Sequence, residues 1–111
     1  MNIRMVYITA GSREEARTIG KLLVESHLAA CVNILGPVNS LYMWEGRLED
    51  ATEYVLIVKS VAEQVPQLVE AVKSAHSYDC PCVVSLRVDD GNSAFLNWIA
   101  DQVRPAPNAI A

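Results

Sequence analysis

The sequence predicts one α+β domain in which helices cover one face of an antiparallel β-sheet. Apolar and β-branched segments typical of strands occur four times, separated by turn residues. Segments with apolar residues three and four positions apart, typical of amphipathic helices, follow the first, third and fourth of them. The resulting order is strand, helix, strand, strand, helix, strand and one further helix. This is the split β-α-β order of the ferredoxin-like fold.

The first strand and helix are predicted from the N-terminal quarter of the chain. Residues Asn2 to Thr9 are rich in Ile, Val and Tyr, and Gly11 ends this strand. The sequence from Ser12 to Glu15 is a capping box, in which the serine accepts a hydrogen bond from the N3 amide and the glutamate reaches back to the cap amide. A helix to about His27 follows, with an apolar stripe of Ala16, Ile19, Leu22, Leu23 and Ser26.

A long β-hairpin is predicted next. One strand covers Leu28 to Leu35 and stops at Gly36-Pro37, and a second extended segment covers Val38 to Trp44. Glu45-Gly46 forms the turn, since glycine tolerates positive φ, and Leu48 to Ser60 return. Arms of roughly twelve residues are about 40 Å long at ~3.3 Å per residue, which exceeds what one small domain can cover. We therefore expect part of the hairpin to pair with another subunit.

The C-terminal half completes the predicted order. Ser60 to Glu63 repeats the capping-box pattern, but Pro66 places the start of the regular helix near Val65, and the helix ends near Ala75. A short strand from Val83 to Val88 follows. The final helix is capped by Asp90-Gly91-Asn92-Ser93, and one of its faces carries Phe95, Trp98, Ile99 and Gln102.

Length and composition limit the classes of function. The 111-residue chain has room for one core, so we expect a single domain over residues 1–104 and a flexible, proline-containing tail over residues 105–111. The net charge of −4 without a basic cluster disfavours nucleic acid. The sequence contains neither an apolar run of membrane-spanning length nor the pattern of a secretion signal. We therefore expect no membrane association, and a cytoplasmic protein with reduced thiols.

Three segments resemble the CutA divalent-ion-tolerance family over residues 3–103. They are SLYMWEGRLEDATEYVLIVKS from residue 40, HSYDCP from residue 76 and FLNWI from residue 95. The resemblance implies tolerance of divalent metals such as copper, and a ferredoxin-like homotrimer whose hairpins cross between subunits. It also implies that shared polar and aromatic positions gather in clefts between subunits. The matching residues here are Trp44, Glu49, Glu53, Lys59, His76, Tyr78 and Trp98.

The loop HSYDCPC departs from the family pattern, which reads His-Pro-Tyr-x-x-Pro-Glu. Ser77 replaces the first proline, and Cys82 replaces an acidic residue that is one of the copper ligands proposed in the family. Cys80 and Cys82 are therefore candidate thiolate ligands for Cu(I) or Zn(II), with His76 as a third donor. The alternative is that both cysteines pack as small apolar side chains, since free cysteine is often buried.

A second candidate site contains Lys59, Tyr78, Glu53, Trp44 and Trp98, together with His76. The even spacing of Glu53 and Lys59 places them on one face of a strand, where they form a solvated or subunit-bridging charge pair. The alternative is that Lys59, His76 and Tyr78 line a polar cleft for a small anion or metabolite. The chain contains no G-x-S-x-G, P-loop, dinucleotide or H-E-x-x-H motif, so we expect neither catalysis nor an organic cofactor. Two functions remain open. One is metal binding, and the other is ligand sensing like that of PII signalling proteins, with a protein partner that the sequence does not identify.

Overall fold

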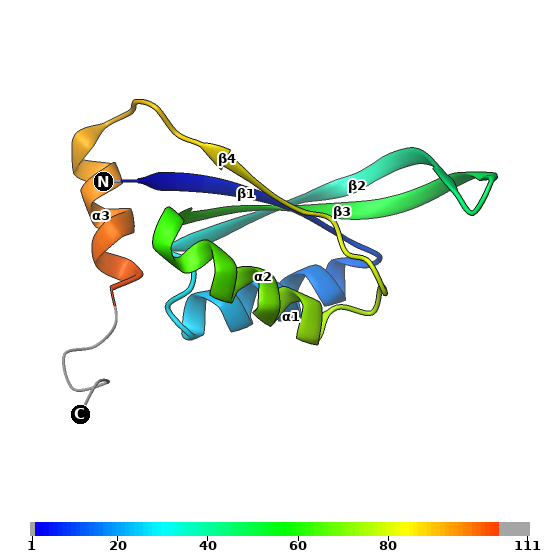
Figure 1. Ribbon diagram of the computed structural model, residues 1–111, viewed down its shortest axis with the longest axis horizontal. Coiled ribbons are helices and arrows are strands. Elements are labelled where there is room, and N and C mark those ends of the chain that lie inside the picture. Colours follow the sequence, from blue (N-terminus) through cyan, green and yellow to red (C-terminus); the bar gives the residue numbers. More distant parts are fainter. Residues whose placement is uncertain (1, 105–111) are drawn as a thin grey trace.

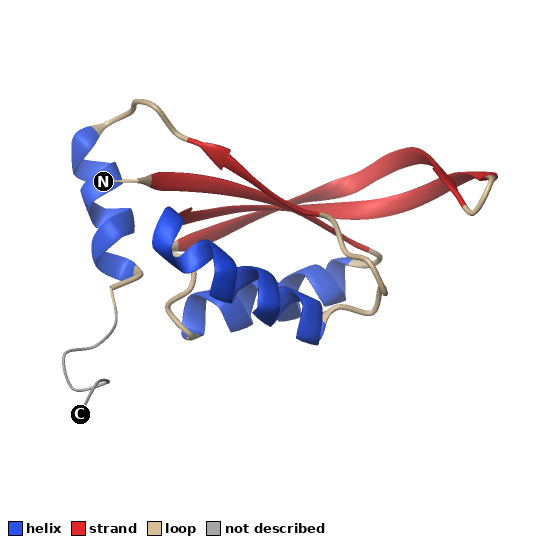
Figure 2. Ribbon diagram, in the orientation of Figure 1, coloured by secondary structure: helices blue, strands red, loops and turns tan. Residues whose placement is uncertain are grey.

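The computed structural model describes residues 2–104, so the predicted tail at residues 105–111 lies outside the described residues. The elements follow the predicted order. They are β1 (Ile3–Ala10), α1 (Arg13–Glu25), β2 (Cys31–Trp44), β3 (Arg47–Val61), a 3₁₀ turn η1 (Ala62–Gln64), α2 (Val65–Ala75), β4 (Val83–Arg87) and α3 (Ser93–Gln102). The four strands form one sheet in the order β2-β3-β1-β4 with antiparallel neighbours (Figure 2). The predicted α+β class and antiparallel sheet are confirmed.

Helices α1 and α2 lie side by side on one face of the sheet (Figure 1). The largest fully buried side chains of this layer include Ile8 and Leu56 from the sheet and Ile19, Leu23 and Leu68 from the helices. Helix α3 packs at one end of the sheet over a second, smaller cluster. None of the helices within residues 2–104 combines the length and the apolar character needed to cross a membrane.

The start of α1 confirms the first capping box only in part. The Ser12 hydroxyl accepts a hydrogen bond of 3.1 Å from the amide of Glu15, as predicted. The Glu15 carboxylate, however, accepts from the amide of Gly11 rather than from that of Ser12. The helix ends at Glu25, two residues before the predicted end, and Leu22 from the predicted apolar stripe remains 40% exposed.

The second predicted capping box, at Ser60, is wrong. Ser60 is fully buried at the end of β3, and its hydroxyl donates a 2.6 Å hydrogen bond to the carbonyl of Leu28. The chain instead forms η1, and α2 then begins at Val65 with Pro66 in its first turn and without a side-chain cap. Pro66 predicted a helix start near Val65, because proline is tolerated in the first turn of a helix. This prediction is confirmed.

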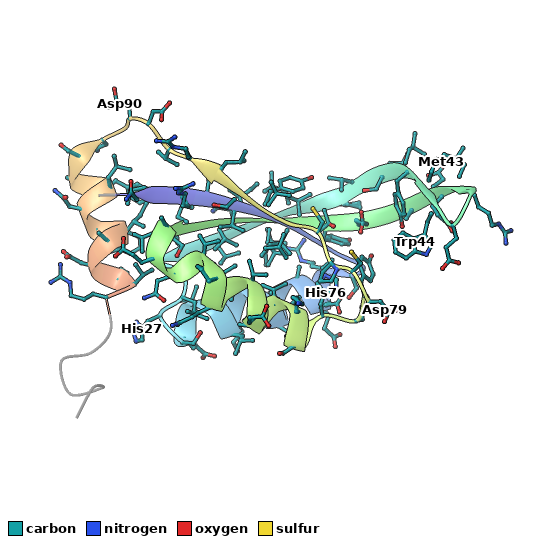
Figure 3. All side chains as sticks on the ribbon, viewed as in Figure 1. His27, Met43, Trp44, His76, Asp79 and Asp90 are labelled. Carbon is teal, nitrogen blue, oxygen red and sulfur yellow. The ribbon has the colours of Figure 1, made fainter. Side chains whose placement is uncertain are left out.

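The hairpin strands are longer than predicted. Strand β2 continues through Gly36 and Pro37, because a β-bulge places these two residues opposite Tyr54 alone. The turn residues Glu45 and Gly46 have φ values of 51° and 78°, as two-residue hairpin turns require. The hairpin projects past the helices, so Met43 and Trp44 lie beyond the main body of the chain (Figure 3).

The face of the sheet opposite α1 and α2 is largely uncovered by the described residues. Core residues such as Leu56 and Val58 alternate along β3 with residues that point to this second face. Helix α3 covers its end at Ile3 and Val61. Farther along, exposed fractions are 36% to 52% for Met5, Tyr7, Val84 and Leu86. We call these four residues the open sheet face.

Candidate functional site

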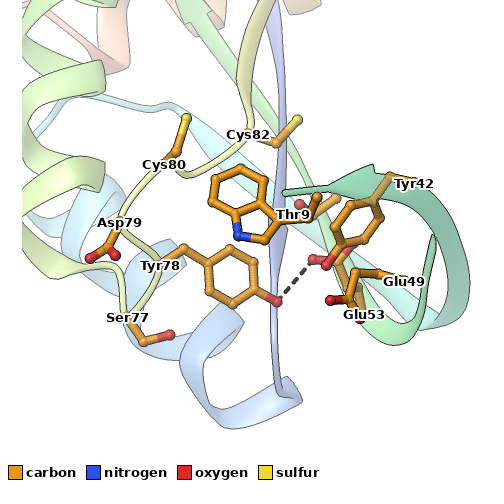
Figure 4. A pocket seen from close by; sticks show the side chains of 10 residues that line it. Thr9, Tyr42, Glu49, Glu53, Ser77, Tyr78, Asp79, Cys80 and Cys82 are labelled. Carbon is orange, nitrogen blue, oxygen red and sulfur yellow. Dashed lines mark hydrogen bonds between the residues drawn. The ribbon is translucent and has the colours of Figure 1, made fainter. Parts of the chain in front are cut away.

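A cavity of about 520 Å³ opens beside the projecting half of the hairpin, next to the loop formed by residues 76–82 (Figure 4). The 76–82 loop connects α2 to β4 and passes the end of β1. Segments that are far apart in the sequence therefore meet at one wall. The lining residues are Thr9, Tyr42, Trp44, Glu49, Glu53, Ser77, Tyr78, Asp79, Cys80 and Cys82.

His76 holds the loop against β1. Its Nε2 lies 2.7 Å from the carbonyl oxygen of Thr9, and its Nδ1 lies 3.0 Å from the amide nitrogen of Tyr78. A carbonyl only accepts and an amide N–H only donates, so in this arrangement Nε2 donates to Thr9 and Nδ1 accepts from Tyr78. Both ring nitrogens therefore have protein partners in this conformation.

Glu15 provides a second anchor for the loop. One carboxylate oxygen accepts from the amide of Gly11 at 3.2 Å, and the other accepts from the amide of Ser77 at 2.9 Å. Burial by itself raises the pKa of Glu15, but the hydrogen bonds from Ser77 and Gly11, together with the nearby His76, lower it more, so the net pKa lies below its usual value. The ionised carboxylate thus joins the start of α1 to the loop.

Tyr78 points from the loop into the cavity and donates a 2.9 Å hydrogen bond to Oε2 of Glu53 (Figure 4). Burial, the hydrogen bond to Glu53 and the negative charge of that carboxylate raise the pKa of Tyr78 to about 12. Gly11 packs closely beside this contact, since a Cβ there would lie 3.1 Å from the tyrosine oxygen. The rings of His76 and Tyr78 also pack together, with centroids 4.6 Å apart.

Both candidate cysteines line the cavity as free thiols, Cys80 exposed and Cys82 partly buried. Burial and the charge of Glu53 raise the pKa of Cys82, while the hydroxyl of Thr9 opposes the shift. The Cys82 thiol is therefore protonated at neutral pH. Within residues 2–104, no three His, Cys, Asp or Glu side chains are already placed to hold a metal ion.

The structure brings only part of the predicted ligand cleft together. Glu53, Tyr78 and Trp44 line the cavity. Lys59 shares a strand face with Glu53 but lies ~20 Å farther along it at ~3.3 Å per residue, and its amine bonds the side chain of Asn33. Trp98 lies on α3, at the end of the molecule opposite the hairpin turn, and its ring is stacked against that of Phe95.

The wall also contains residues that the sequence prediction did not include. Tyr42 lies opposite Glu49 in the hairpin, so this pair follows from the position of the turn. Asp79 belongs to the HSYDCPC loop but was not among the predicted ligands, and Thr9 gave no signal, because its position depends on how the loop passes β1. The charged residues of the described wall are Glu49, Glu53 and Asp79, without lysine, arginine or histidine. This composition favours a cation over an anion.

Comparison with known proteins points to the same protein family as the hairpin and loop motifs. The model of the family described as CutA1 divalent ion tolerance protein matches residues 4–102. The chain belongs to this family. The divalent-cation tolerance protein CutA of Archaeoglobus fulgidus is 46% identical over 98 residues, which cover 88% of this chain and 95% of that protein. The Thermus thermophilus protein of the same name is 43% identical, with 87% and 94% covered.

Solved CutA structures share the fold over nearly the whole chain. The Thermus thermophilus structure has a TM-score of 0.89 at 42% identity and covers 90% of this chain and 97% of its own. CutA1 from Oryza sativa has a TM-score of 0.92 at 33% identity, covering 96% and 97%. The Archaeoglobus fulgidus protein is described as periplasmic, whereas the curated rice relative is named as chloroplastic. The CutA resemblance of the three sequence segments is confirmed.

Proposed function

We propose that this CutA protein supports tolerance of divalent cations by binding metal ions in the cavity beside the 76–82 loop. The observation that carries the proposal is that Cys80 and Cys82 face a cavity whose charged lining residues are all acidic. Thiolates suit Cu(I) and Zn(II), and a neighbouring carboxylate such as Asp79 suits harder divalent ions. His76 is a third donor only if it gives up its bond to Thr9 or to the Tyr78 amide.

Isothermal titration of the reduced protein with Cu(I) and Zn(II) tests this proposal. Cys80→Ser and Cys82→Ser should each weaken binding at least tenfold. Cys31→Ser is the matched control, because Cys31 lies on β2 outside the cavity. Affinity should also rise with pH, since the metal must displace a proton from Cys82, whose pKa is raised. Unchanged binding in both loop variants would remove the thiols from the site.

We also propose that the chain works as a homotrimer in which hairpins contact neighbouring copies. The open sheet face leaves apolar side chains partly exposed, and the projecting hairpin exposes Leu41, Met43 and Leu48 by 63%, 64% and 69%. Exposed apolar side chains on both surfaces favour association. Light scattering should give three times the chain mass of 12.2 kDa. A single-chain mass would contradict the proposal.

The second candidate function is ligand sensing like that of PII signalling proteins, in a cleft between subunits, with the bound state passed to a protein partner. The observation that favours it is the cavity volume of about 520 Å³, which lies in the range of small-molecule sites and far exceeds a bare ion. Thermal shift against metals and metabolites separates the two functions, because only a ligand that prefers the native state raises its melting temperature. The absence of catalysis and of an organic cofactor, and a cytoplasmic location, stay predictions.

A further inference from the structure

We propose that the carboxylate and aromatic part of the cavity binds a small organic cation, of the protonated aliphatic amine class. This inference deepens the ligand-sensing function proposed above and concerns the same cavity. It differs from the small anion or metabolite that was one of two alternatives left open by the sequence. Lys59 is bonded to Asn33 and does not line this cavity.

The first argument is the charge of the wall. Glu49, Glu53 and Asp79 line the cavity, and its described wall carries no lysine or arginine to balance them. His76 does not line the cavity, and both of its ring nitrogens are engaged, by the carbonyl of Thr9 and the amide of Tyr78. Clefts lined by one sign of charge raise the local concentration of ligands of the opposite sign. The cavity therefore attracts cations and repels a free carboxylate or phosphate.

The second argument is the state of Glu53. This residue is only 5% exposed, and of its two carboxylate oxygens Oε2 accepts the hydrogen bond from Tyr78. Oε1 receives no hydrogen bond from residues 2–104, although Glu53 lines the cavity. Oε1 is open to the cavity, since the only fully buried side-chain oxygen or nitrogen without a partner in residues 2–104 is Oγ of Ser85. An ammonium N–H in the cavity can donate to this oxygen and balance the negative charge.

The third argument is the aromatic character of the same wall. Tyr42, Trp44 and Tyr78 line the cavity with the acidic residues. Tyr42 is the cross-strand partner of Glu49, so a ring and a carboxylate lie next to each other (Figure 4). Aromatic faces attract organic cations, tryptophan most strongly, and also cover the alkyl groups of such ligands. Together with the volume of about 520 Å³, this wall suits an alkylamine better than a bare metal ion.

Calorimetry and thermal shift on the full chain with 1,4-diaminobutane test the inference. Butane-1,4-diol and succinate are the matched neutral and anionic probes of the same length. We expect saturable binding and a raised melting temperature with the diamine alone. Glu53→Gln should weaken binding at least tenfold, because the amide keeps an oxygen for Tyr78 but loses the charge. Trp44→Leu should weaken it severalfold.

Glu63→Gln is the control, since Glu63 is exposed on η1 away from the cavity and its change removes the same charge. Glu49→Gln replaces Glu53→Gln if that variant does not fold. Equal binding of diamine and diol, or equal loss in Glu63→Gln, overturns the inference. Zinc binding that depends on Cys80 and Cys82 without diamine binding overturns it and leaves the metal proposal intact. Diamine binding without metal binding supports it and removes the metal proposal.

Discussion

The phenol of Tyr78, on the 76–82 loop, donates its hydrogen bond to Glu53, a glutamate of β3 whose exposed fraction is 5%. The pairing keeps the phenol protonated, because the carboxylate of Glu53 accepts its proton in a hydrogen bond. The pKa of Tyr78 is raised to about 12 by burial and by this contact. The loop is thereby tied to the wall of the cavity.

Alkaline titration followed by tyrosinate absorbance should therefore show a step near pH 12. Because the pKa of Tyr78 is raised in the folded state, its contacts stabilise the fold at pH values below the ordinary pKa of 10.0. This stabilisation is lost as the pH rises toward 12. Tyr78→Phe should remove this step, and Glu53→Gln should move it to lower pH. A titration of Tyr78→Phe that retains the step near pH 12 would contradict the assignment.

Glu15→Gln should loosen the loop from the start of α1. The substitution removes the charge that strengthens the hydrogen bonds from Gly11 and Ser77, and we expect a loss of about 1 kcal/mol at pH 7. The pKa of Glu15 is lowered in the fold, so its contribution is present above the ordinary value and is lost as the pH falls through the folded value. Urea unfolding at pH 7 and pH 3 measures this. Glu14→Gln is the control. An equal loss of stability in Glu15→Gln at pH 7 and at pH 3 would be inconsistent with an ionised Glu15 that holds the loop.

The fold was predictable because each element carries its own periodic pattern. The wrong predictions arose where a contact with a distant part of the chain overrides a local sequence pattern. Ser60 matches a helix cap, but its hydroxyl donates instead to the carbonyl of Leu28, in the connection between α1 and β2. Gly36-Pro37 matches a strand end, but the bulge opposite Tyr54 absorbs both residues. Neither partner is visible in the surrounding sequence.

The candidate site was predictable only where strand geometry decides it. The turn at Glu45-Gly46 fixes the register, and with it the pairing of Tyr42 with Glu49. The six-residue spacing of Glu53 and Lys59 predicts one strand face, but the same spacing separates them by ~20 Å at ~3.3 Å per residue. Of the two, only Glu53 lines the cavity. The path of the 76–82 loop decides which side chains face the cavity, and that path depends on contacts with Thr9 and Glu15.

Ser85→Ala should be neutral or stabilising by up to about 1 kcal/mol. The hydroxyl of Ser85, on β4 opposite the core residue Val6, is buried without a hydrogen-bond partner among the described residues. Ser60→Ala is the matched comparison, because that hydroxyl does have a partner in the Leu28 carbonyl. Its loss should cost ~1–3 kcal/mol, since a buried acceptor then stays unpaired. Urea unfolding of both variants compares their free energies of unfolding. A larger loss of stability in Ser85→Ala than in Ser60→Ala would refute the prediction.

Gly36→Ala should destabilise the hairpin by ~1–3 kcal/mol. Gly36 has a φ of 153°, and a Cβ at this position would lie 2.5 Å from the ring of Tyr54. Gly46→Asn should have the smaller effect, because the turn has open space and asparagine tolerates its φ of 78°. Thermal unfolding at equal chain concentration compares the two. A loss in Gly46→Asn as large as that in Gly36→Ala would show that the bulge is not the sensitive point.

Leu86→Lys should dissociate the proposed trimer without unfolding the chain. Leu86 is 52% exposed on the open sheet face, so lysine is tolerated in a single chain but places a charge in an interface that covers this face. Leu22→Lys is the control, since Leu22 is 40% exposed on α1, on the opposite side of the sheet. Light scattering should show a lower mass for Leu86→Lys alone, with circular dichroism unchanged. An unchanged mass in Leu86→Lys would place any interface elsewhere, on the projecting hairpin.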